Sequence, residues 1–188
     1  MSLDRSTGLK VRLEENRVKR RERRRKMEHT TKMISIWMAL VAVLALSGVS
    51  QAQAPSYGND VNLALAKKVM AAAEAEATKN KSTVVIAIVD THGLLVMLQR
   101  MDDTQTASVR VAIAKARTAA MFKRPTKELE DTVAGGRVAA LGLPGATPLE
   151  GGLPLMQGGK IIGAIGVSGM SSAKDIQVAK AGVDAVGQ

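Results

Sequence analysis

The sequence contains no cysteine in its 188 residues. This absence excludes disulfides, thiolate metal sites, cysteine nucleophiles and attachment of a lipid through cysteine. Aromatic side chains are nearly as scarce, since the chain has one Trp, one Tyr and one Phe. Only two histidines occur, His29 and His92. The fold must therefore be held together by an aliphatic core, and a ligand pocket must be lined by Leu, Val and Met rather than by stacked rings.

Positive charge is distributed unevenly along the chain. The first 52 residues contain 12 Lys and Arg against 5 Asp and Glu, whereas residues 53–188 contain 15 against 12. Most of the formal net charge of +10 therefore belongs to the N-terminal segment. A strongly basic chain can indicate a nucleic-acid partner, but the remaining sequence is close to balanced. We predict no nucleic-acid binding.

The N-terminal segment, 1–52, has the order of a secretory signal peptide. A basic run, RVKRRERRRK at 17–26, precedes an apolar run, MISIWMALVAVLAL at 33–46, and a small-residue site ends at Ala52. The apolar run is shorter than the roughly 20 residues that span a bilayer. We therefore predict cleavage after Ala52, a periplasmic or secreted location, and no stable membrane anchor after cleavage. An uncleaved anchor is the alternative.

Two details of this segment stay open. Translation could start at Met1 or at Met27, because the sequence from Met27 onward makes a signal peptide of ordinary design. Cleavage after Ala54 also fits the small-residue rule, although Pro55 would then follow the scissile bond. With cleavage after Ala52, about 136 residues remain, enough for one domain with its own core.

Residues 53–58 are expected to be a loose lead-in to a single domain at 59–188. Within the domain, the β-branched run TVVIAIV at 83–89 is typical of a strand covered on both faces. The turn at 90–93 connects it to a second apolar run, so the two strands are predicted to form an antiparallel hairpin. The expected elements are a helix at 60–78, strands at 83–89 and 94–99, helices at 107–121 and 126–133, strands at 153–156 and 160–167, and a helix at 175–186.

The order of these elements is α-β-β-α-α-β-β-α. Two hairpins favour an antiparallel sheet with helices packed on it, an α+β architecture. We expect Asn59 or Asp60 to cap the first helix and Thr126 to cap the short helix. The tract 135–152 is rich in Gly and Pro and is predicted to be a structured loop.

Four blocks of the domain match the pattern of a known family in order and spacing. They are IAIVDTHGLLVMLQRMDD at 86–103, IAKARTAAMFKRPT at 113–126, GLPGATPLEGGLPL at 142–155 and GGKIIGAIGVSG at 158–169. Together they resemble the GlcG/HbpS family, also called the DUF336 or haem-degrading family. The resemblance covers nearly all of 59–188.

The resemblance implies a profilin-like sheet with flanking helices, a homo-oligomer, and binding of haem or a related tetrapyrrole. Some relatives are fused to corrinoid adenosyltransferases, and secreted ones serve as redox or haem sensors. Haem degradation itself is not carried over to this chain as an activity.

His92 is the candidate ligand for a haem iron. It is the one histidine after the predicted cleavage site, imidazole is a common axial ligand, and a hairpin turn leaves the ring accessible. The alternative is a turn residue that only forms local hydrogen bonds. Many family members have a small residue at this position, so the resemblance does not itself assign the ligand.

Further candidates flank the first hairpin and the helix after it. The cations here could pair with haem propionates, or could belong to a solvated face or a subunit contact. They are Arg100, Lys115, Arg117, Lys123 and Arg124. Thr118 is included with Lys115 because both stand in the matched block at 113–126. Glu150, beside two glycines, is a candidate for binding or catalysis, or for orienting its loop.

We therefore expect an exported haem-binding or haem-sensing protein. One alternative is an enzyme or accessory factor for a small oxygenated metabolite or corrinoid cofactor, acting through Glu150, and another is a structural oligomer without a ligand. No paired-carboxylate or Ser/His/Asp pattern is identifiable, so no catalytic residue is predicted.

Overall fold

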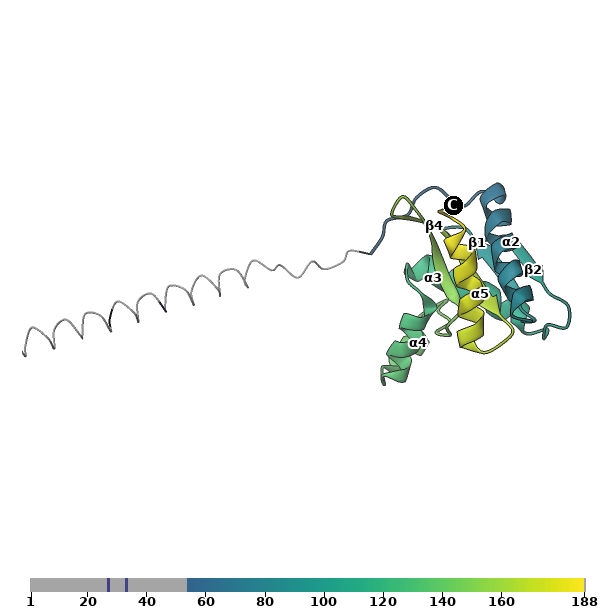
Figure 1. Ribbon diagram of the computed structural model, residues 1–188. Helices are drawn as coiled ribbons and strands as arrows, with labels where there is room; N and C mark the ends of the chain where they lie inside the picture. Colours follow the sequence, from purple (N-terminus) through teal and green to yellow (C-terminus); the bar gives the residue numbers. More distant parts are fainter. Residues whose placement is uncertain (1–26, 28–32, 34–53, 188) are drawn as a thin grey trace, which may run out of the picture. The chain divides into compact units, whose positions relative to one another are not determined.

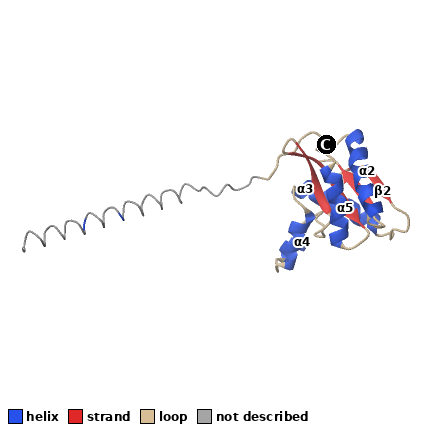
Figure 2. Cartoon of the chain, in the orientation of Figure 1, coloured by secondary structure: helices blue, strands red, loops and turns tan. Residues whose placement is uncertain are grey.

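The computed structural model describes Met27, Met33 and residues 54–187. The chain divides into two units, 1–52 and 53–188, and the second forms the domain shown in Figures 1 and 2. Apart from Met33, the predicted apolar run and the cleavage site lie outside the described residues. None of the described helices is both long enough and apolar enough to cross a membrane.

The predicted order of elements is confirmed, and the fold is α+β. One element was not predicted, a 3-10 helix, η1, inside the tract expected to be a structured loop. The elements are helices α2 (Leu63–Lys79), α3 (Ser108–Phe122), α4 (Thr126–Ala134) and α5 (Ser172–Asp184), the 3-10 helix η1 (Val138–Gly142), and strands β1 (Val85–Val89), β2 (Leu95–Arg100), β3 (Gly152–Gln157) and β4 (Lys160–Ser168).

The sheet has four antiparallel strands in the order β2-β1-β4-β3. β1 therefore lies inside the sheet, and all five of its residues are buried, as its continuous apolar sequence predicted. β4 is also internal, whereas β2 and β3 form the two edges. The first hairpin is joined to the second through the β1–β4 pair, in which Val85 lies opposite Ser168.

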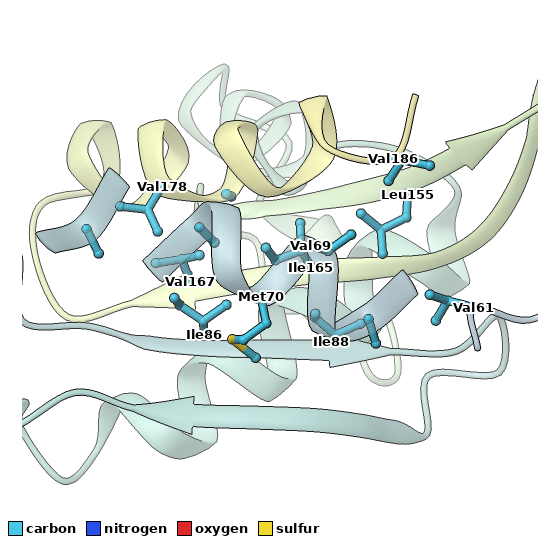
Figure 3. Close-up of a cluster of buried hydrophobic side chains, with 14 of the residues drawn as sticks. Val61, Val69, Met70, Ile86, Ile88, Leu155, Ile165, Val167, Val178 and Val186 are labelled. Atoms are coloured by element: carbon cyan, nitrogen blue, oxygen red, sulfur yellow. The ribbon is translucent and has the colours of Figure 1, made fainter. Parts of the chain in front are cut away.

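The larger core lies between one face of the sheet and helices α2 and α5, which pack side by side (Figure 1). Figure 3 shows Met70 of α2 close to Ile86 and Ile88 of β1, with Ile165 of β4 in the same layer. All four side chains are at most 1% exposed. Burying a side chain of this size stabilises a fold by about 1.5–3 kcal/mol, so this layer supplies much of the stability.

Helix α3 covers the opposite face and packs against β1, β3 and β4. Its contact stripe is made of alanines, including Ala112 and Ala116, which are fully buried. Below them, Gly166 of β4 has no room for a side chain, because a Cβ would overlap the Ala112 carbonyl oxygen and the Ala116 backbone nitrogen. Small residues on both partners thus let the helix backbone contact the strand backbone directly.

Two predicted helix starts were wrong. α2 begins at Leu63, and its cap is Asn62, whose side chain accepts a hydrogen bond from the Leu65 N–H at 2.9 Å. Neither Asn59 nor Asp60 caps the helix. The Asp60 carboxylate instead accepts hydrogen bonds from Thr91 of the first hairpin. α5 begins at Ser172 rather than at position 175, since its first turn is polar and carries little periodic signal.

The predicted cap of the short helix was also wrong. α4 has Pro125 at its N-cap, with no side-chain cap hydrogen bond. The Thr126 hydroxyl is buried and accepts a hydrogen bond from the Gly152 N–H at 3.0 Å. This threonine therefore ties α4 to the start of β3 instead of capping a helix.

The segment before α2 is bound to the domain rather than loose. Ile161 of β4 donates to the Ser56 carbonyl at 2.9 Å and accepts from the Gly58 N–H at 2.7 Å. Between them, the Tyr57 hydroxyl donates to the Ala120 carbonyl of α3 at 3.0 Å. The amine of Lys123 lies 4.2 Å from the centre of the Tyr57 ring, which adds a cation–π contact.

Candidate ligand-binding site

The turn between β1 and β2 is held by its own side chains. One carboxylate oxygen of Asp90 accepts hydrogen bonds from the N–H groups of His92 and Leu94, each at 2.8 Å. Gly93 has φ +79°, a conformation that glycine adopts without strain. The turn leaves the His92 side chain 74% exposed, so the ring is accessible, as the sequence predicted.

Asp60, from the loop before α2, reaches the same turn. Its Oδ1 accepts hydrogen bonds from the Thr91 N–H at 3.0 Å and the Thr91 hydroxyl at 2.5 Å. These hydrogen bonds lower the pKa of Asp60 below its ordinary value of 3.8. Its Oδ2 lies 3.9 Å from Nδ1 of His92. The turn therefore carries an ionised carboxylate beside the imidazole.

The face of β2 on the α3 side of the sheet is only partly covered. Leu98 lies opposite Ala87 of β1 and, beyond a register shift in the ladder, Leu95 lies opposite Val89. The side chains of Ala87 and Val89 belong to the α3 side of the sheet. Leu95 is 51% exposed, and Leu98 and Ile113 are partly buried against the core between α3 and the sheet. We call the strip formed by Leu95, Leu98 and Ile113 the hairpin face.

Basic side chains stand near both ends of the hairpin face. Arg117 follows Ile113 by one helical turn and so lies on the same flank of α3, with its Cγ 3.4 Å from a Cβ built on Gly93. Arg100 ends β2 on the α3 side, opposite Val85. Its guanidinium already donates to the Thr104 carbonyl at 2.8 Å. Of the two arginines, Arg117 is therefore the more available to pair with a ligand.

Lys115 lies on the other flank of α3 and is buried. Its amine donates to the Val167 carbonyl and to Oδ2 of Asp175, each at 2.9 Å. These two acceptors engage the charge inside the protein. The structure thus gives Lys115 a structural role and separates it from His92.

Thr118 shares that flank and is also buried. Its hydroxyl donates to the Ala114 carbonyl at 2.8 Å and accepts from the Thr147 N–H at 2.8 Å, which fastens the loop before β3 to α3. Glu150 follows in this loop, and its N–H donates to the carboxylate of Glu130 on α4. Both residues therefore belong to the β3 side of α3.

Arg124 lies neither at the β1–β2 hairpin nor near β3, but beside a pocket. A pocket of about 270 Å³ opens among the end of α3, α4 and η1. The Arg124 guanidinium also stands 4.0 Å from the Glu128 carboxylate. The pocket is lined by Phe122, Arg124, Leu129, Thr132, Arg137, Ala139, Ala140 and Leu143.

The structure therefore divides the predicted site residues among separate places. His92 and Arg100 border the hairpin face, Lys115, Thr118 and Glu150 lie toward β3, and Arg124 lines the pocket. Asp60 was predicted only as a possible helix cap, because it comes near His92 through tertiary folding. Asp90 was predicted only as part of the turn at 90–93, although its spacing of two residues from His92 is a signal that the sequence carries.

Comparisons with known proteins identify relatives over most of the domain. Protein GlcG of Escherichia coli strain K12 is 47% identical over 104 residues, 55% of this chain and 78% of GlcG. A double mutant of Streptomyces reticuli HbpS has a TM-score of 0.63 and 32% identity, covering 69% of this chain and 88% of that one. A PduOC:haem complex has a TM-score of 0.61 and 30% identity, covering 67% of this chain and 94% of that one.

The sequence profile described as "Haem degrading protein HbpS-like" matches residues 61–184. This match runs from the segment before α2 to the end of α5 and so takes in every strand of the sheet. The chain belongs to the HbpS-like family.

Proposed function

We propose that this chain binds haem or a closely related tetrapyrrole on the hairpin face. The observation that carries the proposal is the partly covered apolar strip on β2, where Leu95 is 51% exposed and Leu98 is partly buried. Placing a flat macrocycle there would remove this apolar surface from water. The PduOC structure, a neighbour of this fold, is a haem complex, which supports the same ligand class.

The groups around the strip suit the charged parts of haem. Arg117 or Arg100, which stand near opposite ends of the strip, can pair with the propionate edge of haem, because a guanidinium matches a carboxylate in a bidentate geometry. His92 offers an exposed imidazole as an axial ligand for the iron. Lys115 and Thr118 are omitted from this site, since both are buried and already hydrogen-bonded.

We further propose that the protein acts outside the cytoplasm as a homo-oligomer that carries or senses haem. The signal-like order of 1–52 supports export, and the exposed edge strand β2 offers a surface for self-association. Sensing would follow if haem occupancy of the hairpin face changes how copies contact one another.

The test is a titration of the purified full chain with hemin, followed by absorbance. We expect a Soret band that saturates, with weaker binding by Leu95→Glu because a charge would stand under the macrocycle. His92→Ala is expected to shift or diminish the band. Leu141→Glu is the matched control, because Leu141 is 60% exposed on η1, away from β2.

Two results would refute the proposal. One is the absence of a Soret shift with the unmodified chain at micromolar hemin. The other is a Leu95→Glu chain that binds hemin as tightly as the Leu141→Glu chain while its circular dichroism spectrum shows native structure.

The pocket beside α4 favours a second function. Its volume of about 270 Å³ and the presence of Arg124 and Arg137 on its wall suit a small oxygenated anion. We propose as the alternative that such a metabolite binds there, with the protein acting as an enzyme or accessory factor. A thermal-shift screen of small hydroxy acids tests it, and Arg137→Gln should abolish the stabilisation. Glu150→Gln tests whether Glu150, which was predicted from the sequence to act on the metabolite, contributes to binding, although it does not line the pocket.

A further inference from the structure

Three metal-ligating side chains converge at the β1–β2 turn. Asp60, Asp90 and His92 each offer one ligand atom, and these atoms all lie within 4.8 Å of one another. Asp60 comes from the segment before α2, and the other two come from the turn itself. The cluster is open to solvent on the Asp60 and His92 side, because both residues are exposed.

Both carboxylates are fixed by one oxygen and free at the other. Oδ1 of Asp60 accepts two hydrogen bonds from Thr91, and Oδ1 of Asp90 accepts two from the turn backbone. Within the described residues, no hydrogen bond occupies Oδ2 of either carboxylate. The second oxygens are thus oriented before a ligand arrives, which reduces the ordering cost of binding.

Among the described residues, no Lys or Arg forms an ion pair with this cluster. The only ion-pair partner of Asp60 in the described part of the chain is His92, at 3.9 Å, and Asp90 has none there. The imidazole of His92 therefore lies beside two carboxylates with which no Lys or Arg of the described residues forms an ion pair.

We propose that the β1–β2 turn binds a divalent first-row transition-metal cation through Asp60, Asp90 and His92. Water would complete the coordination shell. The imidazole nitrogen favours Zn²⁺, Co²⁺ or Fe²⁺ over Mg²⁺ and Ca²⁺, which prefer oxygen ligands alone. Metal–ligand bonds of about 2.0–2.2 Å place two ligand atoms at most about 4.4 Å apart, so the site closes by rotation of one or more of these side chains.

This proposal goes beyond the haem proposal and does not rest on it. The two share His92, so a metal held by the three side chains and a haem ligated by His92 exclude each other. Metal occupancy at the turn would then decide whether the imidazole is available to a haem iron. Asp60 and Asp90 distinguish the two sites, because neither belongs to the hairpin face.

The experiment measures Zn²⁺ binding to the full chain, purified without a polyhistidine tag, by calorimetry, and Co²⁺ binding by visible absorption. We expect one ion per chain. Asp60→Asn and Asp90→Asn keep an oxygen for the hydrogen bonds to Thr91 and to the turn but remove the charged ligand. Each should weaken Zn²⁺ binding by more than the roughly 10- to 100-fold that loss of an outer-shell partner costs.

Three controls keep the result specific. Asp102→Asn changes an exposed carboxylate at the far end of the hairpin and should leave Zn²⁺ binding unchanged, as should His29→Ala. The hemin Soret band should persist in Asp60→Asn and Asp90→Asn. The metal proposal is overturned if the unmodified chain binds no Zn²⁺, or if Asp102→Asn or His29→Ala weakens binding as much as Asp60→Asn. Failure of the hemin titration alone leaves the metal result standing.

Discussion

Lys115 connects the two helical layers of the domain. Its side chain runs past Gly151, where a Cβ would lie 2.8 Å from the lysine Nζ, and ends at Asp175 of α5. The same carboxylate accepts the Met170 N–H at 3.0 Å. Burial raises the pKa of Asp175, and the Lys115 amine opposes that shift. The pair is stable because each charge inside the protein has several partners.

We predict that Lys115→Met destabilises the fold strongly. Removing one partner of a buried ion pair leaves the other charge uncompensated and typically costs about 3–5 kcal/mol. Urea denaturation followed by circular dichroism measures the loss. Arg110→Gln on the exposed side of α3 is the control and should stay within about 0.5 kcal/mol of the unmodified chain. Equal stability of the two variants would contradict this account of Lys115.

Asp60 predicts a specific pH dependence of stability. Its folded-state pKa is lowered from 3.8 by Thr91, so its contribution is fully present above the unfolded-state pKa. That contribution is lost as the pH falls through the lowered folded-state value. Asp60→Asn still accepts hydrogen bonds from Thr91 but no longer titrates. We expect its unfolding free energy to fall less steeply than that of the unmodified chain between about pH 5 and about pH 3, as measured by urea denaturation. Parallel curves would contradict the prediction.

At the scale of elements, the packing of α3 on β4 depends on a glycine. A side chain at Gly166 would meet the backbone of α3 at Ala112 and Ala116, and backbone cannot move aside without lifting the helix. We predict that Gly166→Ala destabilises the fold by about 1–3 kcal/mol, the usual range for overpacking. Chemical denaturation checks this value.

The matched control is Gly142→Ala. A Cβ at Gly142 would have nothing within 4 Å, so its effect on the unfolding free energy should be within about 0.5 kcal/mol. If both alanine variants unfold at the same denaturant concentration, the helix is not held at the distance that the structure gives.

The identity and order of the elements were predictable because each pattern is local. The apolar run at 83–89 predicted a strand covered on both faces, and β1 is fully buried. The start of α2 was not predictable, because three cap-forming residues, Asn59, Asp60 and Asn62, precede it. The choice depends on Thr91, which engages Asp60 from a distant part of the sequence.

The candidate site was only partly predictable for the same reason. Exposure of His92 follows from a turn sequence that local rules identify. Helical periodicity places Lys115 and Arg117 on different flanks of α3. It does not indicate which of the two flanks faces β2. The strand order decides that question, and strand order is a property of the whole sheet.

For the whole molecule, the N-terminal segment gives a prediction about processing. If residues 1–52 direct export, the protein recovered outside the cytoplasm of a bacterial host should begin at Gln53, as measured by intact mass and N-terminal sequencing. Ala52→Glu should block cleavage, because signal peptidase sites require small residues. Recovery of an intact N-terminus outside the cytoplasm would support an uncleaved anchor instead.

The pairing of β1 with β4 also sets the timing of folding during synthesis. Val85 pairs with Ser168, which is synthesised roughly 80 residues later. Ribosomes add about 5–20 residues per second. For several seconds the nascent chain therefore displays VIAIV without one of its two neighbouring strands. Such a segment is prone to aggregate when unpaired, so β1 is where a chaperone that acts on the emerging chain would be of most use.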